Sequence, residues 1–282
     1  MIHRIGILHP GEMGSAVAAT LVNSGMQVGW CSIDRSAATR ARAEALGLTA
    51  HTSLQALCDN SDLVISVCPP HAAIAQAEAV LACGYQGIYA DINAIAPATM
   101  QQIAGSLTAT GISVIDGGII GLPPVARGTT WLYLSGPGAE QLVPCFKAGP
   151  MEVKVLGREI GQASGLKMCF AANSKGTAAM HTAILGAAEA MGVREALEQQ
   201  WDIYNPGFTA KTHGRIRQVA RKAWRFTGEM QEIASTLANC GMPPAFHQGA
   251  ADIYERQVGF KDTAEEPSIT EILAAVRPET DD

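Results

Sequence analysis

Several features that mark other classes of protein are missing from this sequence of 282 residues. The seven cysteines form no Cys-x-x-Cys pair and mostly lie in apolar runs, which is typical of small core residues in a reducing compartment. No His, Cys and acidic residues group as metal ligands would. No run of about 18 apolar residues occurs, and the start of the chain lacks a signal-peptide pattern. We therefore expect a cytoplasmic protein without a metal or a membrane span.

The charges argue against a further class. The net charge is −6, from 20 basic and 26 acidic side chains, and the sequence shows no basic stripe. Nucleic acid is therefore not expected as the main partner. A hydrophobic content of 48% at this length can build a large core, in one large domain or in two.

The stretch from Ile5 to Ser36 has the order strand, glycine-rich turn, small-residue helix, strand, as in the first half of a dinucleotide-binding fold. In such a turn Gly11 lets the backbone approach a pyrophosphate, and Gly14 lets the helix pack close to the sheet. His9 replaces the usual first glycine, and we expect this to add backbone strain. The candidate cofactor contacts in the turn are His9, Pro10, Gly11, Glu12, Met13 and Gly14.

The residues after the second strand bear on the choice of cofactor. An acid there bonds the ribose hydroxyl of NAD, whereas arginine accommodates the 2′-phosphate of NADP. Asp34 offers the first contact, while Arg35, Ser36 and Arg40 together can surround a dianion. We expect NADP, with NAD as the alternative.

Two later apolar strands end in residues that we expect near the cofactor, because ligands of open α/β sheets bind beyond the carboxyl ends of the strands. Cys68, Pro69 and Pro70 follow one strand, and Asn93 follows the other. Asn93 can donate and accept at once, which suits a carboxamide or a substrate hydroxyl. A plain Asx turn is the alternative for Asn93.

A third strand is predicted to end near Ile115 and to enter a glycine-rich loop. Backbone N–H groups exposed at Gly117, Gly118 and Gly121 can hold a substrate carboxylate. A loop that binds no ligand is the alternative explanation for these glycines.

The composition changes near residue 161. Strands and helices alternate before it, and helix follows helix after it. We predict an α/β protein, with a Rossmann-type doubly wound parallel sheet over residues 1–160 and an all-helical C-terminal domain over residues 161–282. Residues 162–191 are predicted to form one long helix, apolar on most faces and therefore buried between domains or between subunits.

The order of these motifs, with Gly161-x-Ala163-x-x-x-Lys167 after them, resembles the β-hydroxyacid dehydrogenase family, relatives of 6-phosphogluconate dehydrogenase. The similarity covers residues 1 to about 190, and the segments at Trp224 and His247 resemble a C-terminal domain of the phosphogluconate-dehydrogenase type. The resemblance implies an NAD(P)-dependent oxidoreductase that forms a homodimer and acts on a small hydroxy acid. It implies that Lys167 is the catalytic acid/base, and that Asn93 and the Gly117–Gly121 segment touch substrate or nicotinamide.

The sequence departs from the family pattern after the lysine, because the usual asparagine one turn later is Ala171. On a regular α-helix Ser174 lies about 20° from Lys167, so Ser174 is our candidate to replace it, with Lys175 at the margin of the site. Trp224 and His247 are candidate substrate contacts or packed core residues.

We therefore expect an enzyme that moves a hydride between NADP(H) and the carbon of a CH–OH or C=O group, with Lys167 exchanging the hydroxyl proton. An imine reductase is the first alternative. A non-catalytic NADP-binding sensor or interaction module is the second.

Overall fold

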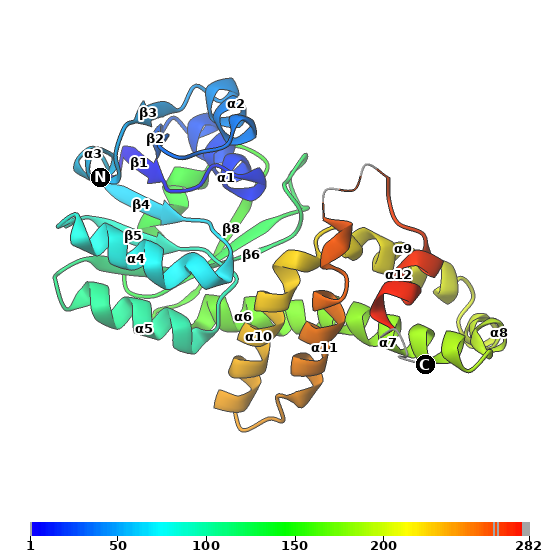
Figure 1. Cartoon of the computed structure of the whole chain (residues 1–282). Coiled ribbons are helices and arrows are strands. Elements are labelled where there is room, and N and C mark those ends of the chain that lie inside the picture. The colour runs from blue at the N-terminus through cyan, green and yellow to red at the C-terminus, as the bar shows by residue number, and fades with distance from the viewer. Residues whose placement is uncertain (1, 262, 264, 278–282) are drawn as a thin grey trace. The chain divides into compact units, whose positions relative to one another are not determined.

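The structure is a computed structural model that describes residues 2–261, 263 and 265–277. Its internal contacts divide the chain into two compact units, Met1–Met168 and Cys169–Asp282. The first unit is an eight-stranded sheet with helices on both faces. The second has helices and, in its described residues, no strand (Figure 1). The predicted fold class, a Rossmann-like sheet followed by a helical region, is confirmed.

The sheet of the first unit has the order β3-β2-β1-β4-β5-β6-β7-β8. The strands β1 to β6 pair in parallel, β7 is antiparallel to β6, and β8 runs with β7, so two reversed strands extend the predicted parallel sheet. The strands are β1 (Arg4–Ile7), β2 (Gln27–Cys31), β3 (Thr49–His51), β4 (Leu63–Ser66), β5 (Ile88–Asp91), β6 (Ser113–Ile120), β7 (Trp131–Ser135) and β8 (Glu152–Gly157).

Helices cover both faces of this sheet, and a separate apolar core lies between each face and its helices. Val17 and Leu21 from α1 and Phe146 from η2 pack on one face. Leu57 from α3 and Met100 from α5 pack on the other. The helical elements are α1 (Glu12–Asn23), α2 (Ala37–Ala45), α3 (Leu54–Asp59), η1 (Pro70–Ala72), α4 (Ala73–Ala82), α5 (Pro97–Thr108), η2 (Ala139–Phe146) and the start of α6 (Gln162–Ala171).

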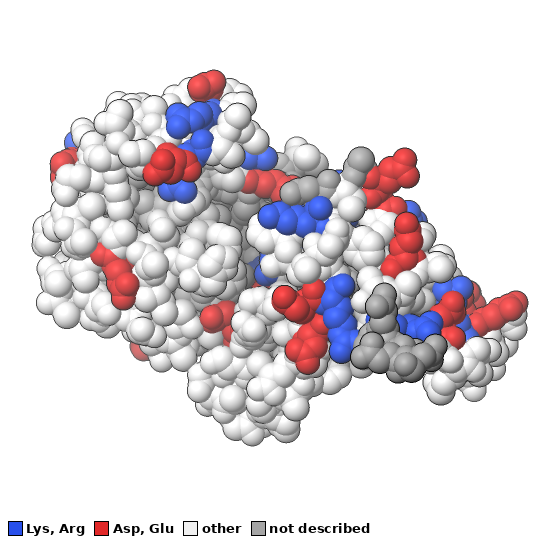
Figure 2. Space-filling view, viewed as in Figure 1, with Lys and Arg blue, Asp and Glu red and all other residues white. Residues whose placement is uncertain are grey.

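The charged side chains of this unit are unevenly spread. Figure 2 shows lysine, arginine and acidic side chains gathered around α2, while the surface over α4 and α5 is nearly free of them. The sequence explains the second observation, because Glu78 is the one charged residue within the bounds of α4 and α5.

The second unit packs helices around a core that includes Leu185, Ile216 and Ile272. Ser268 begins the last helix with a capping box, in which its hydroxyl accepts from the backbone N–H of Glu271 and the Glu271 carboxylate accepts from the backbone N–H of Ser268. The elements are η3 (Ala172–Gly176), α7 (Thr177–Ala190), α8 (Arg194–Tyr204), α9 (Phe208–Ala220), α10 (Ala223–Asn239), α11 (Ala245–Glu255), η4 (Val258–Phe260) and α12 (Ile269–Val276).

The predicted long helix over 162–191 is helical but not one regular α-helix. A π-helical turn, η3, separates α6 from α7. A π-turn bonds residue i to i+5, so it is wider than an α-turn and rotates the chain by less per residue. The helical phase expected for Ser174 and Lys175 relative to Lys167 is therefore wrong, because both residues lie inside this turn.

The sequence also contains a basic stretch, although the net charge of the chain is negative. Residues 208–225 carry six basic side chains and no acidic one. Three of the arginines have partners in the same unit, because Arg215 donates to the carbonyl of Ser174, Arg217 pairs with Glu266 and Arg221 donates to the carbonyl of Thr263. The interpretation that the sequence has no basic stripe is therefore wrong for α9 and the start of α10.

Candidate functional site

The turn between β1 and α1 is shaped as a dinucleotide phosphate would require. A Cβ added to Gly14 would lie 2.0 Å from the carbonyl oxygen of His9, so only glycine lets α1 approach the turn this closely. Gly11 is different, because an added Cβ would meet no atom within 4 Å and its φ of −71° suits any residue. The protein itself does not need glycine at position 11. Its absent side chain leaves space in front of the first amides of α1, where an anion binds.

His9 fits the turn without the strain that we expected. Among the described residues, Asp34 is the one non-glycine residue with a positive φ, at 54°, so His9 does not take the left-handed conformation. The His9 imidazole is half-buried, and its Nδ1 atom has neither a hydrogen-bond partner nor contact with solvent. Burial, with the nearby charge of Arg35, lowers the pKa of His9 to about 4, so the ring is neutral at pH 7.

The predicted ribose-binding residues lie together at the start of α2. The Arg35 guanidinium folds back and donates to the carbonyls of Leu8 and Cys31, at 3.3 and 3.4 Å, across the carboxyl ends of β1 and β2. Ser36 caps α2 by accepting from the N–H of Thr39, and Arg40 donates to the carbonyl of Arg35. Asp34 is exposed next to them. These groups present positive charge where a ribose phosphate would lie, and Asp34 leaves the NAD alternative open.

Asn93 is placed differently from our expectation. It is 3% exposed, and its side-chain oxygen accepts from the backbone N–H of Cys68 at 2.5 Å. Its amide nitrogen donates to Ser66 and to Asp91. These bonds tie the end of β4 and the chain leading to Pro69 and Pro70 to the end of β5. Both N–H groups of the Asn93 amide are used in these bonds, so the structure gives Asn93 a bracing position.

Asp91 is a titratable group that the sequence did not bring to our attention. It is fully buried at the carboxyl end of β5 and lies beside Asp116 of β6 in the strand register. Burial raises the pKa of Asp91 to about 7, while the hydrogen bonds from Asn93 oppose the rise and the charge of Asp116 adds to it.

The predicted loop at Gly117, Gly118 and Gly121 is wrong in part, because β6 continues through Ile120 and holds the first two glycines in the sheet. A Cβ on Gly117 would lie 2.4 Å from the side chain of Ile92. Gly121 has φ of +128° and ends the strand. These glycines serve packing and chain direction, so they need no carboxylate to explain them.

The structure brings together Lys167 and Gly118, two of the predicted site residues. A Cβ on Gly118 would lie 2.9 Å from Cβ of Lys167 and 2.8 Å from the carbonyl oxygen of Ala163, so α6 lies directly against the carboxyl-terminal half of β6. Lys167 itself is half-buried. Lys167 belongs to the first unit, and its Cβ lies against β6 beyond Asp116, the residue that pairs with the last residue of β5.

The other predicted substrate residues belong to the second unit, and two of them have structural partners there. Lys175 contacts both carboxylate oxygens of Glu229 at 2.5 Å and lies over the ring of Phe226. The His247 ring packs so tightly on the π-turn that a Cβ on Gly176 would lie 2.7 Å from its Nε2. The Lys175 charge is thus neutralised within the unit, and these positions do not support a substrate contact for either residue.

Ser174 and Trp224 are less enclosed. The Ser174 hydroxyl donates to the carbonyl of Ala171 at 3.5 Å. Trp224 is 39% exposed, with Lys261 over its ring at 4.3 Å and Arg225 at 5.9 Å. Both predicted roles stay predictions.

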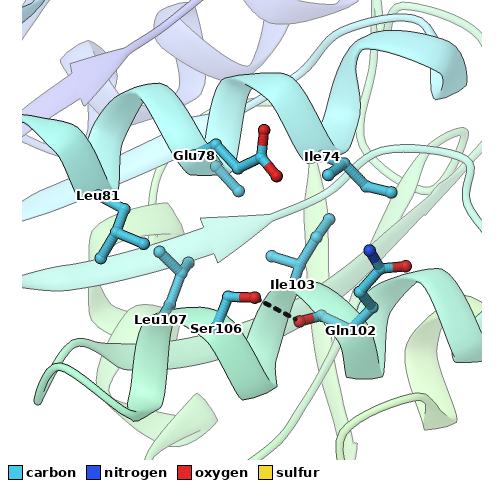
Figure 3. Close-up of a pocket in the computed structure, with 8 residues that line it drawn as sticks. Ile74, Glu78, Leu81, Gln102, Ile103, Ser106 and Leu107 are labelled. Atoms are coloured by element: carbon cyan, nitrogen blue, oxygen red, sulfur yellow. Dashed lines mark hydrogen bonds between the residues drawn. The ribbon is translucent and has the colours of Figure 1, made fainter.

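A groove between α4 and α5 has no part in this site (Figure 3). The groove has a volume of about 230 Å³ and is open to solvent. Among the residues drawn, one hydrogen bond is marked, from the Ser106 hydroxyl to the carbonyl of Gln102. The lining residues are Ile74, Ala77, Glu78, Leu81, Gln102, Ile103, Ser106 and Leu107. The groove contains none of the predicted site residues.

No three His, Cys or acidic side chains within residues 2–261, 263 and 265–277 come together as metal ligands would. In the same part of the chain, every helix is too short or too polar to cross a lipid bilayer.

A family model described as the NAD binding domain of 6-phosphogluconate dehydrogenase matches residues 4–152, more than half of the chain. The chain belongs to this family. A second model, described as a domain of unknown function (DUF1932), matches residues 188–257 in the helical unit. The resemblance inferred from the motifs is therefore confirmed.

Two sequence relatives cover the same share of the chain. An uncharacterized 28.5 kDa protein of Methanothermus fervidus is 29% identical over 194 residues, which cover 69% of this chain and 74% of the relative. The mitochondrial 3-hydroxyisobutyrate dehydrogenase of Drosophila melanogaster is 27% identical over 199 residues, which cover 69% of this chain and 60% of that enzyme. The chain thus aligns with less than two thirds of the Drosophila enzyme.

Several solved structures share the fold over nearly the whole chain. The 3-hydroxyisobutyrate dehydrogenase of Mycobacterium tuberculosis matches with a TM-score of 0.71 at 19% identity, covering 99% of this chain and 100% of that one. An imine reductase of Myxococcus stipitatus in complex with NADP⁺ matches with a TM-score of 0.56 at 17% identity, covering 96% of this chain and 98% of that one. At these identities the likeness shows the fold alone.

Proposed function

We propose that the protein is an NADP(H)-dependent oxidoreductase that acts on the CH–OH or C=O group of a small hydroxy acid or related substrate. The observation that carries the proposal is the placement of Lys167 against Gly118 in the unit that holds the Gly11 turn. A lysine that packs near the carboxyl ends of the parallel strands is suitably placed to act as a proton donor to a bound substrate. The family membership supports the cofactor class.

The residues present fit a dinucleotide. Gly11 and the first turn of α1 would face the pyrophosphate, and Arg35, Ser36 and Arg40 would lie beside the adenosine ribose. The cofactor, when bound, supplies or accepts the hydride. The positive charge at Arg35 and Arg40 supports NADP over NAD in this proposal.

Lys167 would exchange the proton of the substrate oxygen. In the direction of reduction its ammonium donates a proton to the oxygen as the carbonyl carbon gains the hydride, and in oxidation its neutral amine takes that proton back. Such acid–base assistance is worth about 10² to 10⁴ in rate.

One assay separates this proposal from its alternatives. NADPH and NADH oxidation is followed with a panel of keto acids, aldehydes and cyclic imines, and the reverse reaction with small hydroxy acids. The proposal predicts turnover of at least one carbonyl or hydroxy-acid substrate with loss on Lys167→Ala. Turnover of imines alone would favour an imine reductase. No turnover by a folded protein that binds the cofactor would favour a sensor.

A further inference from the structure

We propose that Asp116 is a positioning residue for Lys167, acting through the first turn of α6. The inference rests on the proposed function, because it concerns the residue that would move the proton. Asp116 is in the middle of β6, and it was not among the residues that the sequence pointed to.

The carboxylate of Asp116 accepts hydrogen bonds from the residues at the start of α6. Its Oδ2 accepts from the backbone N–H groups of Gly161, Ala163 and Ser164, at 2.8, 3.1 and 3.1 Å. Its Oδ1 accepts from the Ser164 hydroxyl. The hydroxyl of Ser135 donates to Oδ2 at 2.9 Å and accepts from the N–H of Ala163 at 3.0 Å. Asp116 and Ser135 therefore cap the helix from two neighbouring strands.

This cap is fully buried. Asp116, Ser135 and Ser164 each have 0% exposure, so water does not replace a bond that is lost. The first N–H groups of a helix have no partner inside the helix, and its N-terminus favours a negative charge. A buried carboxylate that accepts several bonds there is a strong anchor, because charged acceptors form the stronger hydrogen bonds.

The same strand also touches α6 under Lys167. Side chains at positions 116 and 118 point to the same face of β6, because a strand repeats every two residues. Gly118 has no side chain on this face, and a Cβ added there would collide with Ala163 and Lys167. Asp116 thus fixes where α6 begins, and Gly118 fixes how closely α6 lies on the sheet at Lys167. The two contacts together set the position of the amine.

The alternative role for Asp116 is stability alone. A stabilising cap would change the free energy of unfolding without changing the turnover of molecules that remain folded. A positioning residue changes turnover in the folded protein and leaves cofactor binding intact. A misplacement of about 1 Å can cost about 10²-fold in rate, so the two roles give distinguishable results.

The test compares Asp116→Asn and Gly118→Ala with matched controls. Asp59→Asn removes an exposed carboxylate, and Gly105→Ala adds a methyl group to a helix where no atom lies within 4 Å. Hydrogen exchange of the peptide spanning 161–168, kcat, KM and the NADPH Kd are measured at a temperature at which all four variants are folded.

We expect Asp116→Asn to speed exchange at 161–168 by at least about tenfold and to lower kcat by about 10- to 100-fold, with the NADPH Kd within about twofold. Gly118→Ala should lower kcat similarly, and both controls should match the parent. Unchanged exchange and kcat in folded Asp116→Asn would overturn the proposal, as would a kcat loss matched by an equal loss of NADPH affinity. If Asp116→Asn does not fold, Ser135→Ala, which removes one supporting bond, takes its place with the same criteria.

The proposed function can fail separately. A parent protein that turns over nothing on the panel refutes the proposed function, and with it any role for Asp116 in turnover. The exchange measurement still decides whether Asp116 anchors α6.

Discussion

The carbonyl oxygen of His9 lies where a side chain on Gly14 would begin, 2.0 Å from an added Cβ. This contact differs from that at Gly11, three residues earlier, where an added Cβ meets nothing within 4 Å. Different causes therefore explain the two glycines of this motif. Gly14 is needed for folding, and Gly11 leaves room for a ligand.

Alanine substitutions should separate these reasons. Gly14→Ala should destabilise the protein by at least about 1–3 kcal/mol, because the backbone at His9 cannot move aside cheaply. Gly11→Ala should cost no more than about 1 kcal/mol, through the poorer helix cap, yet weaken NADPH binding at least about tenfold. Thermal unfolding and fluorescence titration measure the two effects. A Gly11→Ala protein with parental NADPH affinity would show that the turn does not hold the pyrophosphate.

The buried Asp91 should make stability depend on pH. Because its pKa is raised to about 7 in the folded protein, the native state keeps a proton that the unfolded state loses at lower pH. Its stabilising contribution is therefore complete below about pH 4 and is lost as pH rises to about 7. We expect Asp91→Asn to remove this part of the slope in urea unfolding measured from pH 4 to 8. Parallel profiles for parent and variant would show that Asp91 does not titrate in this range.

Arg35 should decide the cofactor preference. Its guanidinium lies across the ends of β1 and β2, next to Ser36 and Arg40. We expect the parent to bind NADPH more tightly than NADH, and Arg35→Ala to remove most of that difference by weakening NADPH alone. Arg42→Ala, an exposed charge on α2, is the control. Equal affinities for both cofactors in the parent would contradict the expectation.

The ion pair between Lys175 and Glu229 should act in stability. Glu229 has 5% exposure, so Glu229→Gln leaves a largely buried ammonium without its partner and should cost about 3 kcal/mol. Adding Lys175→Met should recover much of that loss, because the unpaired charge is gone. Urea unfolding of the two single variants and the double variant measures the coupling. A Lys175→Met protein of parental stability whose KM is raised tenfold or more would restore the predicted substrate contact.

Local patterns predicted the features that local chemistry decides. The glycine turn and the strands and helix around it follow from spacing within a few residues, and the structure confirms these elements. Gly117 and Gly118 were misread because their reason is packing against Ile92 and α6, which a linear pattern does not reveal. Asp116 was missed because its partners at 161–164 lie 45 to 48 residues away in the sequence.

The π-turn is another feature that the sequence did not predict. Its carbonyls are held by distant side chains, since Tyr254 donates to the carbonyl of Lys175 and Arg215 to that of Ser174. A phase argument from α-helical geometry cannot include such contacts. Asn93 illustrates the same point, because either of its two readings fitted the sequence until Cys68 and Ser66 were seen to engage its amide.

The central claim is that Lys167 moves the proton, and one comparison tests it most directly. The turnover number and the NADPH Kd are measured for the parent, for Lys167→Ala and for Lys147→Ala, an exposed lysine that serves as control. The account predicts that Lys167→Ala lowers kcat by at least about 10² with NADPH affinity nearly unchanged, while Lys147→Ala matches the parent. A folded Lys167→Ala protein that binds NADPH and turns over at nearly the parental rate would contradict it.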